Sequence, residues 1–150
     1  MTGKQDYDAT VTLDINAPIE AVWAALTEPE LVKQYMYGAN LVTDWSVGGQ
    51  ITWSGAWEGK PYQDKGIVLG CEPNKRLQYT HWSPLSGVED KSENYHTVTV
   101  ALRENKESTG LTLTQSNNPS QAAADTMANN GWRPMMLGLK TVAEAQSNLE

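Results

Sequence analysis

The chain contains no phenylalanine and only one cysteine, Cys71, among its 150 residues. A single cysteine excludes an internal disulfide and the paired Cys-x-x-Cys motifs of redox and zinc sites. The sequence also has no run of about eighteen apolar residues and no secretory hydrophobic segment near its start. We therefore expect a cytoplasmic protein without a membrane partner.

Basic residues are scarce as well. Eleven Lys and Arg face eighteen Asp and Glu, which leaves a formal net charge of −7. The basic residues occur singly, apart from the pair Lys75-Arg76, so no positive stripe is available for phosphate contacts. This distribution argues against a nucleic-acid partner and against an anionic membrane surface.

Motifs of catalysis and metal binding are missing too. Gly48-Gly49 is not followed by the Gly-Lys-Ser/Thr of a phosphate-binding loop, and no serine stands in a Gly-x-Ser-x-Gly context. His81 and His96 have no third ligand at a useful spacing, so no metal site and no cofactor are expected. These two histidines remain candidates for a polar pair, without a motif that makes either one catalytic.

Six Trp and six Tyr are what the chain has in abundance. Both side chains combine an apolar body with a polar tip, and they suit either a protein core or a partly wet wall. The length and the 39% hydrophobic content predict one globular domain over residues 1–150. Residues 149–150 are interpreted as a possible tag remnant.

Hydrophobic periodicity predicts the order of the elements. Residues 7–15 alternate as a half-buried strand, two short helices follow up to Met36, and the region from residue 40 to 116 reads as extended segments joined by turns. A final helix is predicted from Asn118-Pro119-Ser120 onward, strongest over residues 132–147, with either a kink or a break at Pro134. Six or seven strands in this order predict an antiparallel meander.

Several local signals refine these boundaries. Asn16 or Ala17 is expected to cap the first helix, and Thr27-Glu28-Pro29-Glu30 resembles a capping box for the second. Gly48-Gly49 is expected to close a tight hairpin because glycine adopts positive φ without a steric penalty. Residues 83–93 form a polar loop that is long enough to act as a lid.

An antiparallel sheet with one apolar face has to cover that face. Here the two short helices and the long C-terminal helix are the available cover. A curved sheet gripping the last helix is the expected arrangement, and the space between them is a candidate cavity. Trp53, Trp57, Tyr79, Trp82, Tyr95, His96, Trp132, Met135 and Leu139 are its predicted walls.

Longer segments carry a family resemblance. The segments NAPIEAVWAALTEPELV (16–32), DWSVGG (44–49) and Gly66…Pro73…Leu77-Gln78-Tyr79, with TVTVAL (97–102) and GLTLTQ (110–115), resemble the START-like (SRPBCC) superfamily. Within it, the chain is similar to the branch named after the activator of heat-shock protein 90 ATPase, over roughly residues 8–145. The resemblance implies an α+β helix-grip (START/Bet v-like) fold of order β-α-α-β6-α with a ligand-accessible interior. One departure is Gln34-Tyr35-Met36-Tyr37, which stands where the family often has a tryptophan pair.

Three functions stay open. The first is binding of a hydrophobic small molecule, such as a lipid or an aromatic metabolite. The second, which the resemblance implies, is a stress-related co-chaperone domain that binds a chaperone. The third is a cyclase- or hydrolase-type enzyme that uses His81, His96 or Tyr95 for proton transfer. His81 and His96 share parity with the inward residues of their strands, which predicts that they lie near each other at the cavity mouth. The alternative is that one or both lie at a solvent-exposed edge of the sheet.

Overall fold

The computed structural model describes residues 7–147. Seven strands, four α-helices, one π-helical segment and two short 3-10 turns follow one another along the described residues. Their bounds are β1 (Tyr7–Ile15), α1 (Ile19–Thr27), α2 (Pro29–Tyr35), β2 (Asn40–Val42), β3 (Gln50–Trp57), β4 (Lys60–Glu72), β5 (Arg76–His81), η1 (Pro84–Ser86), η2 (Ser92–Asn94), β6 (His96–Asn105), β7 (Ser108–Asn118), α3 (Gln121–Thr126), η3 (Met127–Trp132) and α4 (Arg133–Ser147). The predicted order of elements is confirmed. Residues 149–150, which we interpreted as a tag remnant, lie outside the described residues.

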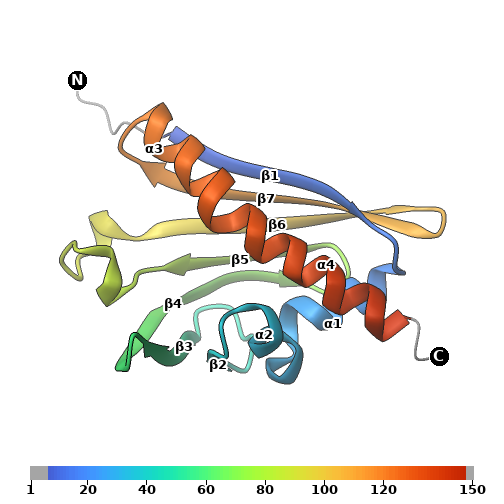
Figure 1. The fold of residues 1–150 in the computed structure, drawn as a ribbon, viewed down its shortest axis with the longest axis horizontal. Coiled ribbons are helices and arrows are strands. Elements are labelled where there is room, and N and C mark those ends of the chain that lie inside the picture. The colour runs from blue at the N-terminus through green and yellow to red at the C-terminus, as the bar shows by residue number, and fades with distance from the viewer. Residues whose placement is uncertain (1–6, 148–150) are drawn as a thin grey trace.

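All seven strands form one antiparallel sheet in the order β1-β7-β6-β5-β4-β3-β2. Strands β2 to β7 make the predicted meander, and β1 joins its far edge beside β7 (Figure 1). The register aligns Val11, Leu113, Val100 and Leu77 across four neighbouring strands. All four are buried, so alternation along each strand produces one continuous apolar face.

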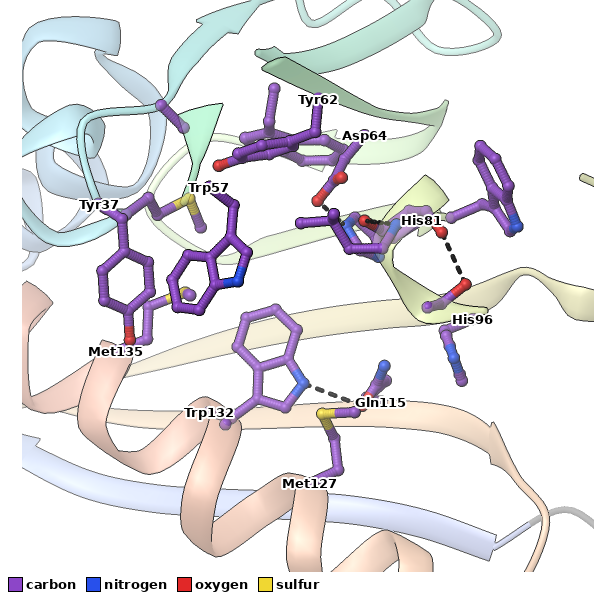
Figure 2. A pocket seen from close by; sticks show the side chains of 18 of the residues that line it. Tyr37, Trp57, Tyr62, Asp64, His81, His96, Gln115, Met127, Trp132 and Met135 are labelled. Carbon is purple, nitrogen blue, oxygen red and sulfur yellow. Dashed lines mark hydrogen bonds and ion pairs between the residues drawn. The ribbon is translucent and has the colours of Figure 1, made fainter. Parts of the chain in front are cut away.

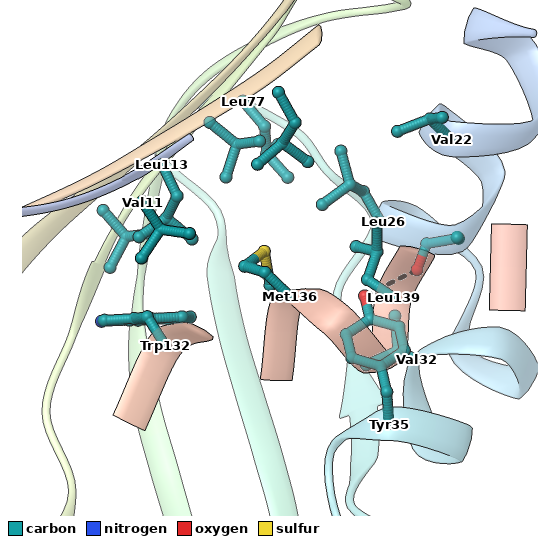
Figure 3. Packing of buried hydrophobic residues seen from close by; sticks show 14 of the residues in the cluster. Val11, Val22, Leu26, Val32, Tyr35, Leu77, Leu113, Trp132, Met136 and Leu139 are labelled. Carbon is teal, nitrogen blue, oxygen red and sulfur yellow. Dashed lines mark hydrogen bonds between the residues drawn. The ribbon is translucent and has the colours of Figure 1, made fainter. Parts of the chain in front are cut away.

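The helical segments from Gln121 to Ser147 run diagonally across this apolar face (Figure 1). Met136 and Leu139 of α4 are buried against Leu113 and Leu77 of the sheet, as Figure 3 shows. Helices α1 and α2 pack beside α4 and close the other end of the core. This is the helix-grip arrangement, and the predicted fold class is confirmed.

The break predicted at Pro134 takes a specific form. Residues 127–132 make a π-helical turn, in which the N–H of Arg133 donates to the carbonyl of Ala128 five residues earlier. Proline at the next position has no N–H and cannot continue the ordinary pattern of the preceding turn. The helix therefore widens before the proline instead of ending. Such π turns are frequent at functional sites, and this one borders the cavity described below.

The predicted caps of the first two helices are wrong. Pro18 and Glu28 are the N-cap residues, and neither supplies a side-chain cap. The Thr27 hydroxyl donates instead to the carbonyl of Trp23, one turn back in α1. A serine or threonine at the end of a helix can choose this local acceptor over the N–H groups that follow it. The capping box consequently does not form.

The connection between β2 and β3 is also longer than predicted. Strand β2 ends at Val42, and a turn closed by the Gly49 N–H and the Ser46 carbonyl at 2.9 Å precedes β3. Gly48 has φ +87°, which explains one of the two glycines. Both glycines then pair with Val68 of β4, because Gly48 N–H donates to the Val68 carbonyl and Val68 N–H donates to the Gly49 carbonyl. Within residues 7–147, no helix is long and apolar enough to cross a membrane.

Candidate ligand cavity

A cavity of about 470 Å³ opens between strands β3 to β5, the segment η3 and the 3-10 turn η1. Side chains from the sheet form one wall and side chains from the C-terminal helix form the other (Figure 2). Half of the lining residues are Trp, Tyr or Met, and the polar ones are Asp, His, Ser, Asn and Gln. The lining comprises Met36, Tyr37, Ala39, Trp53, Trp57, Tyr62, Asp64, Tyr79, His81, Trp82, Ser83, Leu85, Ser86, Asn94, His96, Gln115, Met127, Gly131, Trp132 and Met135.

The inner part of the sheet wall is a cluster of three rings. Trp53 lies 5.1 Å from Tyr79 and 5.2 Å from His81, measured between ring centroids. Alternation brings Tyr79 and His81 to the same face of β5, and Trp53 reaches them from β3. Burial raises the pKa of Tyr79 well above its usual value. Its hydroxyl therefore stays protonated at neutral pH and can donate a hydrogen bond.

The rim is formed by a second aromatic pair, Tyr37 and Trp57. Their rings meet edge to face with centroids 6.4 Å apart. Trp57 is 52% exposed and Tyr37 is 69% exposed, although both line the cavity. Large aromatic side chains at an opening offer apolar contact area to a molecule that enters.

The helix wall begins at the π-helical segment. Met127, Gly131 and Trp132 come from this segment, and Met135 follows one turn later in α4. The indole Nε1–H of Trp132 donates to Gln115 Oε1 of β7 at 2.9 Å (Figure 2). Both residues are buried, so this hydrogen bond fixes the indole relative to the sheet.

The principal polar feature is an aspartate–histidine pair. His81 Nε2 lies 2.9 Å from Asp64 Oδ2 (Figure 2). The other carboxylate oxygen, Oδ1, is buried and has no hydrogen-bond partner among the described residues. A carboxylate oxygen accepts, so His81 donates from Nε2 and the carboxylate holds its ring in place.

His96 is held separately. It pairs with His81 in the register of β5 and β6, as the sequence predicted for a pairing across the 83–93 loop. Its Nδ1 lies 2.8 Å from the carbonyl oxygen of Ser116. A carbonyl only accepts, so Nδ1 carries the hydrogen and Nε2 is left as the second polar atom of the ring. Both histidines line the cavity, each with its own partner.

Two predicted wall residues do not line the cavity. The Tyr95 hydroxyl donates to Asp90 at 2.6 Å and its ring stacks on Trp82 at 6.4 Å. Burial, together with this hydrogen bond, raises the pKa of Tyr95 to about 12. Leu139 is fully buried in the core beside Met136. Tyr95 is held in the loop by Asp90 and Trp82, whereas Leu139 lies about two turns beyond Trp132 on the same side of the helix and packs in the core away from the cavity.

The loop between β5 and β6 forms one side of the cavity mouth through Leu85 and Ser86. Lys65 of β4 forms an ion pair with Asp90 of this loop at 2.5 Å. Its ammonium also lies 5.8 Å from the centroid of the Trp82 ring. The indole N–H of Trp82 in turn donates to the Val88 carbonyl. These contacts tie the loop to the sheet.

Sequence reasoning missed Tyr62 and Asp64 of β4, and it missed Gln115 of β7. A signal for Asp64 was present, because Asp64 lies directly opposite Trp53 in the pairing of β3 and β4. Directly opposed residues of an antiparallel pair face the same side of the sheet. Knowing the register of this hairpin would have placed Asp64 beside the predicted Trp53.

The fold and the cavity define a helix-grip protein with an apolar interior space between its sheet and its last helix. The family model described as "Activator of Hsp90 ATPase homolog 1-like protein" matches residues 16–144. The chain therefore belongs to this family, within the START-like (SRPBCC) superfamily. None of the curated proteins matches the chain.

Solved structures agree with this assignment. Protein ChR145 from Cytophaga hutchinsonii is 45% identical, with a TM-score of 0.80, over 94% of this chain and 96% of that one. Protein MLL2253 from Mesorhizobium loti is 28% identical, with a TM-score of 0.69, over 91% and 97%. The Aha1 dimer from Colwellia psychrerythraea is 20% identical, with a TM-score of 0.69, over 91% and 96%, and shares the fold.

Proposed function

We propose that this protein binds a hydrophobic small molecule in the cavity between the sheet and the C-terminal helix. The observation that carries the proposal is the cavity itself, about 470 Å³ with walls of Trp, Tyr and Met. Ligand sites of proteins commonly have volumes of roughly 300–1,000 Å³ and apolar walls with a few polar groups. Methionine side chains on the helix wall adapt their shape to different guests.

Titration with a neutral aromatic probe, 2-naphthalenemethanol, tests this proposal by isothermal titration calorimetry. We expect saturable binding of one molecule per chain. Trp57→Ala removes a rim ring from the cavity and is expected to weaken binding about tenfold. Ile67→Ala is the control, because Ile67 is an exposed apolar residue of the same sheet that does not line the cavity.

Native mass spectrometry against a panel of lipids and aromatic metabolites extends the test. A panel without a single bound species, together with no heat of binding for the naphthalene probe, would contradict the proposal. Equal affinities of Trp57→Ala and the unsubstituted protein would place the binding site elsewhere.

The Asp64–His81 pair favours a second candidate function, proton transfer to a bound ligand. Asp64 orients His81, as a general base requires. With 2-acetylnaphthalene in deuterated water, the imidazole would take a proton from the methyl carbon, leaving an enolate that takes back a deuteron. Faster deuterium uptake than in buffer, measured by NMR and lost in His81→Gln, is expected. Uptake at the buffer rate would exclude this function.

Binding to a chaperone is the function that the family description suggests. The exposed rim residues Tyr37 and Trp57 are its candidate contacts. A pull-down with the middle domain of an Hsp90 chaperone tests it, with Tyr37→Ala as the variant expected to reduce capture. We propose a cytoplasmic location for the protein together with this function.

A further inference from the structure

The side chains that line the cavity include a carboxylate but no permanently positive group. The ionisable ones comprise one carboxylate, two histidines and three tyrosines, and neither lysine nor arginine is among them. A hydrophobic anion such as a fatty acid would thus leave its carboxylate without a permanent positive partner. Burying an unpaired charge costs several kcal/mol, on the order of what an apolar contact area can supply.

For a cationic ligand the situation is reversed, because Asp64 can act as its negative partner. One of the Asp64 oxygens accepts from His81, and the other is buried with no partner among residues 7–147. The Asp64 side chain is 18% exposed, and it lines the cavity. Because little water surrounds this carboxylate, its field in the cavity is screened far less than that of a surface carboxylate. A positive group entering the cavity would meet a carboxylate of which one oxygen has no partner among the described residues.

The aromatic walls favour the same sign of charge. Ring faces attract cations through their quadrupole, and tryptophan does so most strongly. The protein already shows this interaction at the edge of the cavity, where Lys65 lies over Trp82 while Asp90 holds its ammonium. Trp53, next to the Asp64–His81 pair, offers an indole of the same kind inside. The net charge of −7 attracts cations toward the molecule as a whole.

We infer that the cavity selects hydrophobic amines: molecules with an apolar, preferably aromatic body and a protonated amino group directed to Asp64. This inference rests on the proposed function and names the class of ligand for the same site. The inference distinguishes this cavity from one that binds fatty acids, where a basic residue would be expected in the place of Asp64.

Three probes that share one naphthalene ring test the inference. They are 2-naphthylmethylamine, 2-naphthalenemethanol and 2-naphthoate, which carry a positive, a neutral and a negative group. Calorimetry is done at about pH 8, where histidine is ordinarily neutral and the amine is protonated. The amine is expected to bind at least about tenfold more tightly than the alcohol, since hydrogen bonds to charged groups exceed neutral ones by this order. The naphthoate is expected to bind most weakly.

The variant Asp64→Asn removes the charge and keeps an oxygen that accepts from His81. We expect its preference for the amine over the alcohol to fall to about onefold, because the amine loses more affinity than the alcohol does. Asp14→Asn is the matched control, because Asp14 is exposed on the outer side of β1 and makes the same change in net charge. It is expected to keep the full preference for the amine.

The outcomes distinguish this inference from the proposed function. Binding of the alcohol without a preference for the amine would overturn the inference and leave the proposed function in place. The same holds if Asp64→Asn retains the preference. Failure of all three probes would contradict the proposed function and the inference together. The comparison of the three probes in the unsubstituted protein decides the case even if Asp64→Asn does not fold.

Discussion

The hydroxyl of Tyr35 joins two helices through a single buried hydrogen bond. It donates to the carbonyl of Ala25 at 2.7 Å, near the C-terminal end of α1 (Figure 3). The last carbonyls of a helix have no partner within the helix, so a buried one needs a donor from elsewhere. Burial raises the pKa of Tyr35 well above its usual value, and the hydroxyl remains a donor at neutral pH.

The substitution Tyr35→Phe is expected to lower the free energy of unfolding by about 1–3 kcal/mol, because it leaves the Ala25 carbonyl buried without a partner. Urea denaturation measures this change. Tyr37→Phe is the matched control, since Tyr37 is 69% exposed and its hydroxyl is accessible to water; we expect a change within about 0.5 kcal/mol. Equal effects of the two substitutions would show that the hydrogen bond contributes nothing.

Among the elements, α4 depends on close contact with α2. A Cβ built on Gly138 would lie 2.8 Å from the Cβ of Tyr35. Alanine in a helix is normally favoured over glycine by about 1 kcal/mol. The Tyr35 Cβ is held by its own backbone, so this contact cannot relax by a simple rotation of the side chain. Packing should therefore outweigh helix propensity at this position.

We expect Gly138→Ala to destabilise the protein by about 1–3 kcal/mol, the usual cost of overpacking. Gly131→Ala serves as the control in the same helical stretch, because the atom nearest to its added Cβ is the flexible end of Met127 at 3.0 Å. Thermal unfolding of both variants provides the comparison. A Gly138→Ala variant as stable as Gly131→Ala would mean that the two helices separate easily.

The contact between the β5–β6 loop and the sheet depends on pH. Hydrogen bonds from Lys65 and from Tyr95 lower the pKa of Asp90 below its usual value. A carboxylate with a lowered folded-state pKa stabilises the folded form fully above the unfolded value of about 3.9, and this contribution is lost as the pH falls through the folded pKa. Acid therefore loosens the loop at the cavity mouth.

The indole N–H signal of Trp82 reports on this loop by NMR, because the group donates to Val88. We expect the signal to shift in the unsubstituted protein only as the pH falls below about 3.9, through the lowered pKa of Asp90. In Asp90→Asn the shift should already be present at neutral pH and should change little on acidification. A pH response that is identical in both proteins would assign it to another group.

For the molecule as a whole, the hydrophobic core is formed where α4 packs against the sheet. Leu139 is fully buried in the core (Figure 3), whereas Leu137 on the same helix is 48% exposed. Leu139→Ala is expected to cost about 2–5 kcal/mol because it leaves a cavity. Leu137→Ala should stay within about 0.5 kcal/mol. If urea denaturation shows similar decreases in the free energy of unfolding for the two variants, the packing of Leu139 between α4 and the sheet does not stabilise the fold.

The order and type of the elements could be predicted because their signals are local. Alternation at period two identified β1, β6 and β7, and helical spacing identified the C-terminal helix. The caps of α1 and α2 and the turn at Gly48-Gly49 could not be predicted. The cap of α2 is lost to a competing partner of Thr27, the Trp23 carbonyl, and the turn depends on the pairing of both glycines with Val68.

The sequence by itself determined which residues form strands and helices, because the periods of two and 3.6 residues act along the chain. It also determined which face of each element is apolar. Only the tertiary structure decided which aromatic residues border the cavity. That choice depends on where the helix crosses the sheet, which places Trp132 at the cavity and Leu139, about two turns farther along, in the solid core. It also depends on the β3–β4 register, which sets Asp64 beside Trp53.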